Sequence, residues 1–156
     1  MANKSIDKSI SISNRKVRFE YELLEVFTSG IQLQGTEIKS LRTGNANLAE
    51  AYCYVQQSEV WITGMYIAEY QYGSYMNHEP KRLRKLLLNK KEINKISSAL
   101  QNVGITLVPL KLYISDKGWA KIEIALAKGK KLHDKREDLK QKDDKRQMDR
   151  ALKKFK

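Results

Sequence analysis

His133 and Asp134 are neighbours in the sequence, and a histidine beside a carboxylate is a pairing that acid–base catalysts use. A catalytic histidine also needs a substrate pocket and an oriented partner. This pair instead lies in a charged run, GKKLHDKR at residues 129–136, after the last strand-like stretch. We therefore predict no catalytic site. We interpret the His133 ring as a group that stacks on a nucleic-acid base or hydrogen-bonds to it, beside phosphate-binding residues: Lys130, Lys131, Lys135 and Arg136.

Other catalytic or metal-binding patterns are not found in the sequence. His78 stands beside Glu79 and Pro80 in a predicted loop, and Cys53 is the single cysteine, so no internal disulfide forms. The chain has no glycine-rich phosphate loop, no paired metal carboxylates and no Cys/His nucleophile pattern. We expect a protein that is not an enzyme and that needs neither cofactor nor metal.

The charge of the chain indicates a polyanionic partner. Its 156 residues include 30 Lys and Arg against 18 Asp and Glu, a net charge of +12. Residues 128–156 hold 13 of the bases and 6 of the acids, and such an uneven distribution is typical of an interaction tail. No window is long and apolar enough to cross a bilayer, and residues 1–14 lack a signal-peptide core. We expect a cytosolic protein that does not bind membranes.

The residues ahead of the tail predict a small folded body. Strand patterns run over 21–28, 31–34, 52–56, 60–67, 105–115 and 119–127, with turns at 29–30, 57–59 and 116–118. Helices are predicted over 36–42, with Thr36 as N-cap, and over 90–103, where Asn89 and Glu92 form a capping box. These elements favour an α+β protein, mainly β with a few helices. A small antiparallel barrel, closed or partly open, is our first interpretation, and an open α+β sandwich is the alternative.

Three segments follow from this assignment. Residues 1–14 are predicted to be flexible, 15–128 to form the RNA-binding body, and 129–156 to form a basic tail. Met148, Ala151, Leu152 and Phe155 make one narrow apolar stripe, so we expect the tail to be mostly disordered alone and helical on a polyanionic surface. The alternative is a solubilising helix that contacts nothing.

Basic residues of the body are the candidates for RNA contact. They lead into the first strand, lie on the exposed side of the first predicted helix, or follow Pro80: Arg15, Lys16, Lys39, Arg42, Lys81, Arg82, Arg84 and Lys85. Tyrosines at 66, 70, 72 and 75 can stack on unpaired bases. Tyr66 and Tyr70 are better interpreted as half-buried strand residues, and both interpretations stay open for Tyr75.

Several segments, in this order along the chain, resemble the small protein B family of bacterial ribosome rescue. They are NRK (14–16), YEL (21–23), GIQLQGTEIKSLR (30–42), GSY (73–75), RKLLLN (84–89), LVPLKLY (107–113) and GKKLHDKR (129–136). The resemblance implies an oligonucleotide-binding-type antiparallel β-barrel with flanking helices and a basic C-terminal tail. It also implies a monomeric RNA-binding adaptor whose body binds the tRNA-like domain of transfer-messenger RNA. The tail then occupies the empty mRNA channel and decoding centre of a stalled ribosome.

The same resemblance assigns roles to particular residues. It places Leu87 and Asn89 in the RNA-binding stretch of the body. In the tail it implies contacts with the small-subunit ribosomal RNA and the mRNA channel by Gly129, Lys130, Lys131, His133, Asp134, Lys135, Arg136 and Leu152.

Two alternatives share the same charge pattern. A structural ribosomal protein or an initiation-factor-like barrel would stay on ribosomes through a salt wash, whereas an adaptor would leave them. An RNA-modifying enzyme that uses His133 would show turnover that His133→Ala abolishes.

Overall fold

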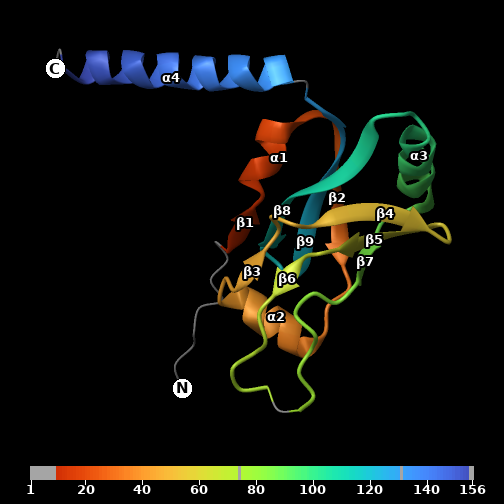
Figure 1. The fold of residues 1–156 in the computed structure, drawn as a ribbon. Helices are drawn as coiled ribbons and strands as arrows, with labels where there is room; N and C mark the ends of the chain where they lie inside the picture. Colours follow the sequence, from red (N-terminus) through yellow and green to blue (C-terminus); the bar gives the residue numbers. More distant parts are fainter. Residues whose placement is uncertain (1–9, 74, 131, 155–156) are drawn as a thin grey trace.

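Seven strands form the main sheet, and this sheet closes on itself (Figure 1). The computed structural model describes residues 10–73, 75–130 and 132–154. The strand order is β1-β8-β4-β5-β7-β2-β9, and an additional β8–β9 pairing joins the two sides, so six strands make a closed antiparallel ring with β1 added on β8. The predicted α+β barrel is confirmed and the open sandwich is wrong. The strands are β1 (Ser11–Ser13), β2 (Tyr21–Ile31), β4 (Tyr52–Gln56), β5 (Glu59–Thr63), β7 (Arg84–Leu87), β8 (Ile105–Ile114) and β9 (Ala120–Gly129).

Two hairpins form where the sequence predicts them, but the first differs in detail, because its loop has two residues rather than three and its return strand β5 ends at Thr63 instead of running to 67. The β4–β5 loop has two residues, Gln57 and Ser58, with φ of 52° and 59°, the left-handed conformation that tight hairpins need. The β8–β9 hairpin turns at Gly118, with φ of 87°. Pro109 cannot donate to a ladder, and the β8–β9 register shifts between Pro109 and Lys111, as at a β-bulge.

Along each strand the side chains point alternately into and out of the barrel, and the inward ones fill its interior. The inward side chains are aliphatic and fully or almost fully buried, among them Val60, Ile62, Leu86, Leu107, Ile122 and Ile124. Cys53 points inward with them, and burial raises the pKa of its thiol, so it is an unreactive core residue.

Four helices flank the barrel in the part of the chain that the structure describes: α1 (Arg15–Glu20), α2 (Gly35–Arg42), α3 (Lys90–Leu100) and α4 (Leu132–Lys154). A second, two-stranded sheet pairs β3 (Ala46–Asn47) with β6 (Tyr66–Ile67). The Asn89 side chain accepts the Glu92 N–H at 2.9 Å, so the predicted cap of α3 is confirmed. The predicted Thr36 cap of α2 is wrong. This helix begins after Gln34, whose N–H donates to Glu37 Oε1 at 2.9 Å.

The N-terminal prediction fails for residues 11–14. Strand β1 pairs with β8, and the buried Asn14 amide donates to Leu48 O at 3.1 Å and Pro109 O at 3.3 Å. These bonds fix a polar segment that its composition alone would leave free. Helix α1 follows directly and buries Val17. It is absent from the sequence-based assignment because its two apolar residues, Val17 and Phe19, lie two positions apart, which is not a helical spacing. Residues 1–9 lie outside the described residues.

Two further boundaries differ from the prediction. Ser29 and Gly30 do not turn but continue β2, because both pair with β9 and Gly30 also pairs with Leu87 of β7. A separate strand over 31–34 is therefore wrong. Val103 lies beyond the end of α3 and is fully exposed rather than on its apolar face.

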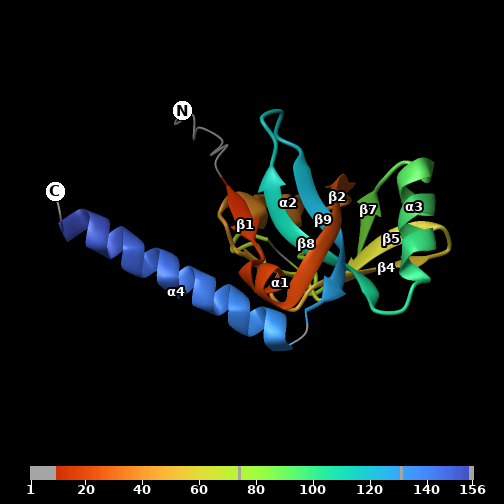
Figure 2. The same cartoon turned by 90° about the horizontal axis from the view of Figure 1, so that it is seen from above.

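Helix α4 extends away from the barrel in both views of the ribbon (Figures 1 and 2). Its described side chains are almost all exposed. The structure holds the tail in its helical form, and the dependence of that helix on a polyanionic surface stays a prediction. None of the described helices is long and apolar enough to cross a membrane.

Candidate nucleic-acid interface

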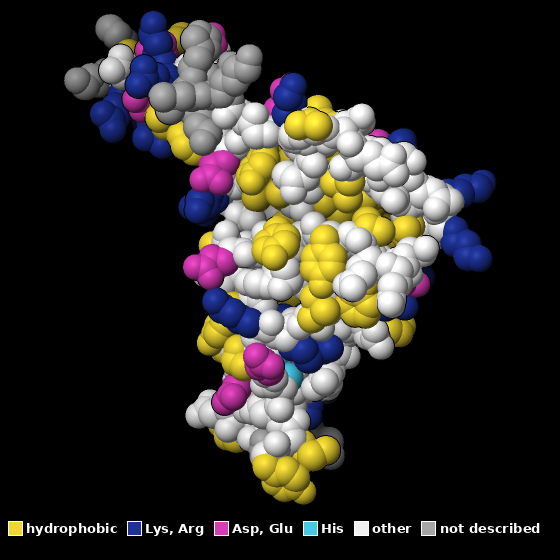
Figure 3. Space-filling view, turned by 45° about the vertical axis from the view of Figure 1, so that its right-hand side comes forward, with side chains coloured by type: hydrophobic (Ala, Val, Ile, Leu, Met, Phe, Trp, Pro, Cys, Tyr) yellow, Lys and Arg dark blue, Asp and Glu magenta, His cyan; other side chains and the backbone are white. Residues whose placement is uncertain are grey.

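An aromatic row crosses the outer surface of β4, β5 and β7. Tyr54 stands opposite Trp61, and Trp61 stands opposite Lys85. Tyr52 lies two residues before Tyr54, with the two ring centroids 6.5 Å apart. Leu87 follows Lys85 on β7 and is 55% exposed. We call these five residues the aromatic face. Figure 3 looks toward this side of the barrel and shows apolar side chains gathered in the middle of it.

The three aromatic residues of this face were not among the sequence-based candidates. The sequence suggests a three-residue loop at 57–59, whereas the hairpin has two loop residues and Gln56 pairs with Glu59. A slip of one residue in such a register moves side chains to the opposite face of the sheet. A two-residue loop assignment would have placed Tyr54 and Trp61 side by side on the outside.

Arg84 does not belong to the exposed basic patch that the sequence predicts at 81–85. Its side chain is 0% exposed and forms an ion pair with the equally buried Glu37. Its other guanidinium nitrogens donate to Met65 O at 2.7 Å and Pro80 O at 3.1 Å. The prediction that Arg84 contacts RNA is wrong, because this side chain holds α2 against β7 from inside the protein.

Glu37 joins two arginines at this position. Arg82 Nη2 lies 2.5 Å from Glu37 Oε1. Burial alone raises the pKa of Glu37, but hydrogen bonds from the Gln34 backbone and from both guanidinium groups outweigh burial and hold that pKa below its ordinary value. Burial lowers the pKa of Arg84, and Glu37 opposes that shift. The carboxylate therefore stays ionised at neutral pH.

The other bases of the run are also compensated. Lys81 Nζ lies 3.1 Å from Glu50 Oε2, and Lys85 Nζ lies 3.5 Å from Glu59 Oε1. Both pairs are at least one-third exposed, so an approaching phosphate is able to compete for the lysines. The run is therefore not an unpaired basic patch, although Lys81 and Lys85 remain accessible.

The remaining basic candidates of the body lie on separate helices. Lys39 and Arg42 are exposed on α2, and Lys39 Nζ lies 5.5 Å from the centre of the Tyr70 ring. Arg15 is exposed on α1, where Lys16 Nζ lies 3.8 Å from Glu20 Oε1. Figures 1 and 2 show α1 and α2 well apart, so these residues form two surfaces rather than one.

Asn89 has a structural task at the start of α3. Its side-chain oxygen accepts from Glu92 N–H. Because the residue is exposed and follows Leu87 by two positions, its amide group stays accessible beside the aromatic face.

The tail begins with an anchored lysine. Gly129 ends β9, and the Lys130 N–H donates to Glu20 O at 2.9 Å. Lys130 Nζ bonds to the Asp138 carboxylate and to Arg18 O, the latter at 3.2 Å. Lys131 and the side chains of His133, Asp134 and Lys135 lie outside the described residues. Arg136 is exposed and Leu152 is 66% exposed, so α4 presents both to solvent.

His78 belongs to the fold rather than to this surface. Its Nε2 donates to Ile67 O at 3.0 Å, so Nδ1 accepts from the Thr36 hydroxyl at 2.9 Å. Among the described residues, no group of His, Cys, Asp and Glu is arranged to hold a metal ion.

Comparison with known proteins identifies the family. The model of the SmpB protein family matches residues 11–154, which is nearly the whole chain. The chain belongs to the SmpB family. The family resemblance seen in the sequence is therefore confirmed.

Relatives match over all or nearly all of their length. The SsrA-binding protein of Phocaeicola vulgatus is 56% identical over 144 residues, covering 92% of this chain and 96% of the relative. That of a Nostoc species is 49% identical over 156 residues, covering 99% and 100%. Among solved structures, this chain matches a chain from "tmRNA-SmpB: a journey to the center of the bacterial ribosome" with a TM-score of 0.67. That chain is 42% identical, and the match covers 80% of this chain and 87% of the other.

Proposed function

We propose that this protein is a non-enzymatic RNA-binding adaptor that binds transfer-messenger RNA and brings it to stalled ribosomes. The observation that carries the proposal is the match to the SmpB family over residues 11–154. The relatives are SsrA-binding proteins, and the related solved structure is of tmRNA-SmpB and the bacterial ribosome. Ribosome rescue takes place where ribosomes work, so the protein acts in the cytoplasm, and we expect it to act as a monomer.

The body holds the transfer-messenger RNA in this proposal. The tRNA-like domain is the part of the RNA that the barrel binds. The aromatic face supplies Tyr54 and Trp61 as stacking surfaces, with Lys85 opposite Trp61 to meet a phosphate. Folded RNA is recognised through its shape and through unpaired bases, and a convex barrel wall with exposed rings suits both. Leu87 and Asn89 continue the same surface.

The tail reaches the ribosome in this proposal. The chain leaves the barrel at Gly129, and the described part of α4 is dominated by charge. It occupies the empty mRNA channel, with His133, Asp134, Lys135 and Arg136 in the decoding centre in place of a codon–anticodon pair. Leu152 lies in the distal region that follows. Because α4 extends from the barrel, one protein is able to hold two RNA surfaces at once (Figure 1).

Replacing Trp61 by Ala tests the proposed role of the aromatic face. We expect affinity for transfer-messenger RNA to fall by about 1–3 kcal/mol, the range for loss of one stacked base. Filter binding at fixed salt measures the change. Trp119→Ala is the matched control, because this exposed tryptophan lies in the β8–β9 hairpin turn. An unchanged Kd for Trp61→Ala would place the RNA elsewhere on the body.

Replacing both Lys39 and Arg42 by Ala tests whether α2 contacts phosphate. Binding releases counterions from each phosphate that the protein neutralises, and a variant with fewer phosphate contacts releases fewer of them. The slope of log K against log[salt] should therefore become shallower by about 0.7–0.9 per lost contact. Binding isotherms at several salt concentrations give the slope. Lys117→Ala, an exposed lysine of the β8–β9 turn outside α2, should leave the slope unaltered. If the α2 variant behaves like this control, α2 faces away from the RNA.

A further inference from the structure

The loop between β6 and β7 carries a second apolar surface. We call residues 68–80 the tyrosine loop, and its described residues, 68–73 and 75–80, project from the barrel at the end opposite α4 (Figure 1). Three large side chains of this loop are strongly exposed: Tyr72 at 79%, Tyr75 at 95% and Met76 at 72%. Figure 3 shows the apolar group at the lower end of the molecule. Single exposed apolar residues are common, but three within five positions form a patch that suits a partner.

The base of the loop is held in place. Asn77 Nδ2 donates to Tyr70 O at 2.8 Å, and Tyr70 N–H donates back to Asn77 Oδ1 at 3.2 Å. A Cβ at Gly73 would lie 2.6 Å from Asn77 Nδ2, so this close approach favours glycine. His78 bonds the loop to α2 through Thr36, as described above. A fixed base loses little conformational entropy on binding, which favours a docking role.

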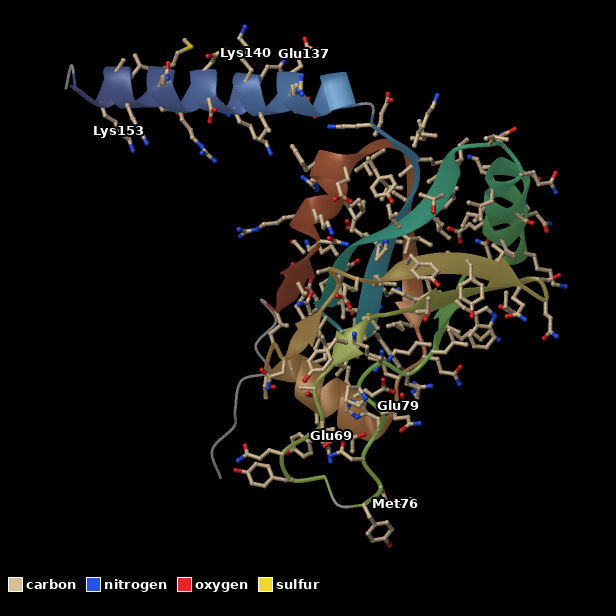
Figure 4. The ribbon with its side chains drawn as sticks, in the orientation of Figure 1. Glu69, Met76, Glu79, Glu137, Lys140 and Lys153 are labelled. Atoms are coloured by element: carbon tan, nitrogen blue, oxygen red, sulfur yellow. The ribbon has the colours of Figure 1, made fainter. Side chains whose placement is uncertain are left out.

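The charge of the loop differs from that of the rest of the chain. Residues 68–80 contain Glu69 and Glu79 and no Lys or Arg, in a protein with a net charge of +12. Both glutamates are exposed and lie on the two limbs of the loop, nearer the barrel than Met76 (Figure 4). A phosphate backbone that lay along this loop would meet the carboxylates of its two limbs. An apolar pocket with a basic rim is complementary to it.

We infer that the tyrosine loop docks on a protein of the ribosome whose surface offers an apolar pocket rimmed by Lys or Arg. The inference rests on the proposed function, which brings the protein to the ribosome. Tyr72, Tyr75 and Met76 fill the pocket, and Glu69 and Glu79 meet the basic rim. This surface is separate from the aromatic face and from α4, so it adds a protein contact to the proposed RNA contacts.

Binding of the full-length protein to transfer-messenger RNA and to ribosomes, measured separately, tests the inference. We expect Tyr75→Ala combined with Met76→Ala to leave the Kd for transfer-messenger RNA within about twofold, because surface substitutions seldom exceed that. Affinity of the protein–RNA complex for stalled 70S ribosomes should fall by about tenfold or more, as for loss of a central apolar anchor. Trp119→Ala is again the exposed-aromatic control. Unchanged ribosome affinity would overturn the inference.

Crosslinking then decides the class of partner. With p-benzoylphenylalanine in place of Tyr75, irradiation of the complex on 70S ribosomes should join the loop to a ribosomal protein. Crosslinks to ribosomal RNA or transfer-messenger RNA alone, or none, would refute it. Glu69→Lys with Glu79→Lys should weaken ribosome binding, and tighter binding would also refute a basic rim. Failure of the unaltered protein to bind transfer-messenger RNA would instead overturn the proposed function itself.

Discussion

Replacing Glu37 by Gln should lower the free energy of unfolding by about 3–5 kcal/mol, the cost of breaking a buried ion pair from one side. The amide keeps the size of the side chain but removes the charge that compensates Arg84, which is fully buried. Arg82 loses the same partner. Urea unfolding followed by far-UV circular dichroism measures the loss. Because the pair joins α2 to β7, we expect one cooperative transition at a lower midpoint, with little change in slope.

An exposed pair provides the control for this prediction. Glu50→Gln breaks the Lys81–Glu50 pair, whose side chains are more than half exposed, and should cost less than about 1 kcal/mol. A loss of that small size for Glu37→Gln as well would mean that Arg84 finds a new partner or that water enters.

The Glu37 carboxyl also makes the stability of the folded protein depend on pH in the acidic range. The folded protein holds the pKa of Glu37 below its ordinary value, so the unfolded chain binds this proton more readily. The stabilisation is therefore fully present above the unfolded pKa and is lost as pH falls through the lower folded pKa. Unfolding midpoints of the unaltered protein and of Glu37→Gln, measured from neutral to strongly acidic pH, test this. The part of the pH dependence that comes from the Glu37 carboxyl should be missing in Glu37→Gln.

Removing residues 137–156 should abolish ribosome rescue while leaving the affinity for transfer-messenger RNA within about twofold. The aromatic face lies on β4, β5 and β7, and no residue of this face belongs to α4. A coupled translation assay that scores tagged product measures rescue, and filter binding measures RNA affinity. Equal loss of both activities would show that the tail is part of the body's RNA site.

A point substitution separates the helical form of the tail from its charge. Gln141 is exposed within α4, and Gln141→Pro removes a backbone donor at a helix cost of about 3 kcal/mol without changing charge. Gln141→Ala is the matched control that favours the helix. If rescue needs α4 as a helix, only the proline variant should fail. Equal activity of both variants would mean that the tail acts as a charged chain.

The elements that the sequence predicts well have their signals close together along the chain. Asn89 and Glu92 cap α3 three residues apart, and Gly118 turns the β8–β9 hairpin within one loop. Helix α1 is different, because only Val17 is buried and the helix is stabilised by what lies beside it. Asn14 is similar, since its partners Leu48 and Pro109 are 34 and 95 residues away.

The candidate site shows the same limit. The charge of Arg84 predicts a surface residue, but its partner Glu37 lies 47 residues away and the pair becomes apparent only when α2 meets β7. The aromatic face depends on the pairing of three strands, two of them joined by a hairpin whose loop length sets the register. Residue types therefore indicate an RNA partner, whereas the surface that meets it depends on tertiary pairing.

Helix α4 is bonded to the body at its start, so a small change of angle there moves its far end by a large distance. Its 23 residues span about 34 Å, and the Lys130–Asp138 ion pair ties the end next to the barrel. A tilt of about 10° at that joint moves the far end by about 6 Å over such a length. Small rearrangements beside Arg18 and Glu20, where Lys130 is bonded, are therefore amplified into large displacements near Leu152.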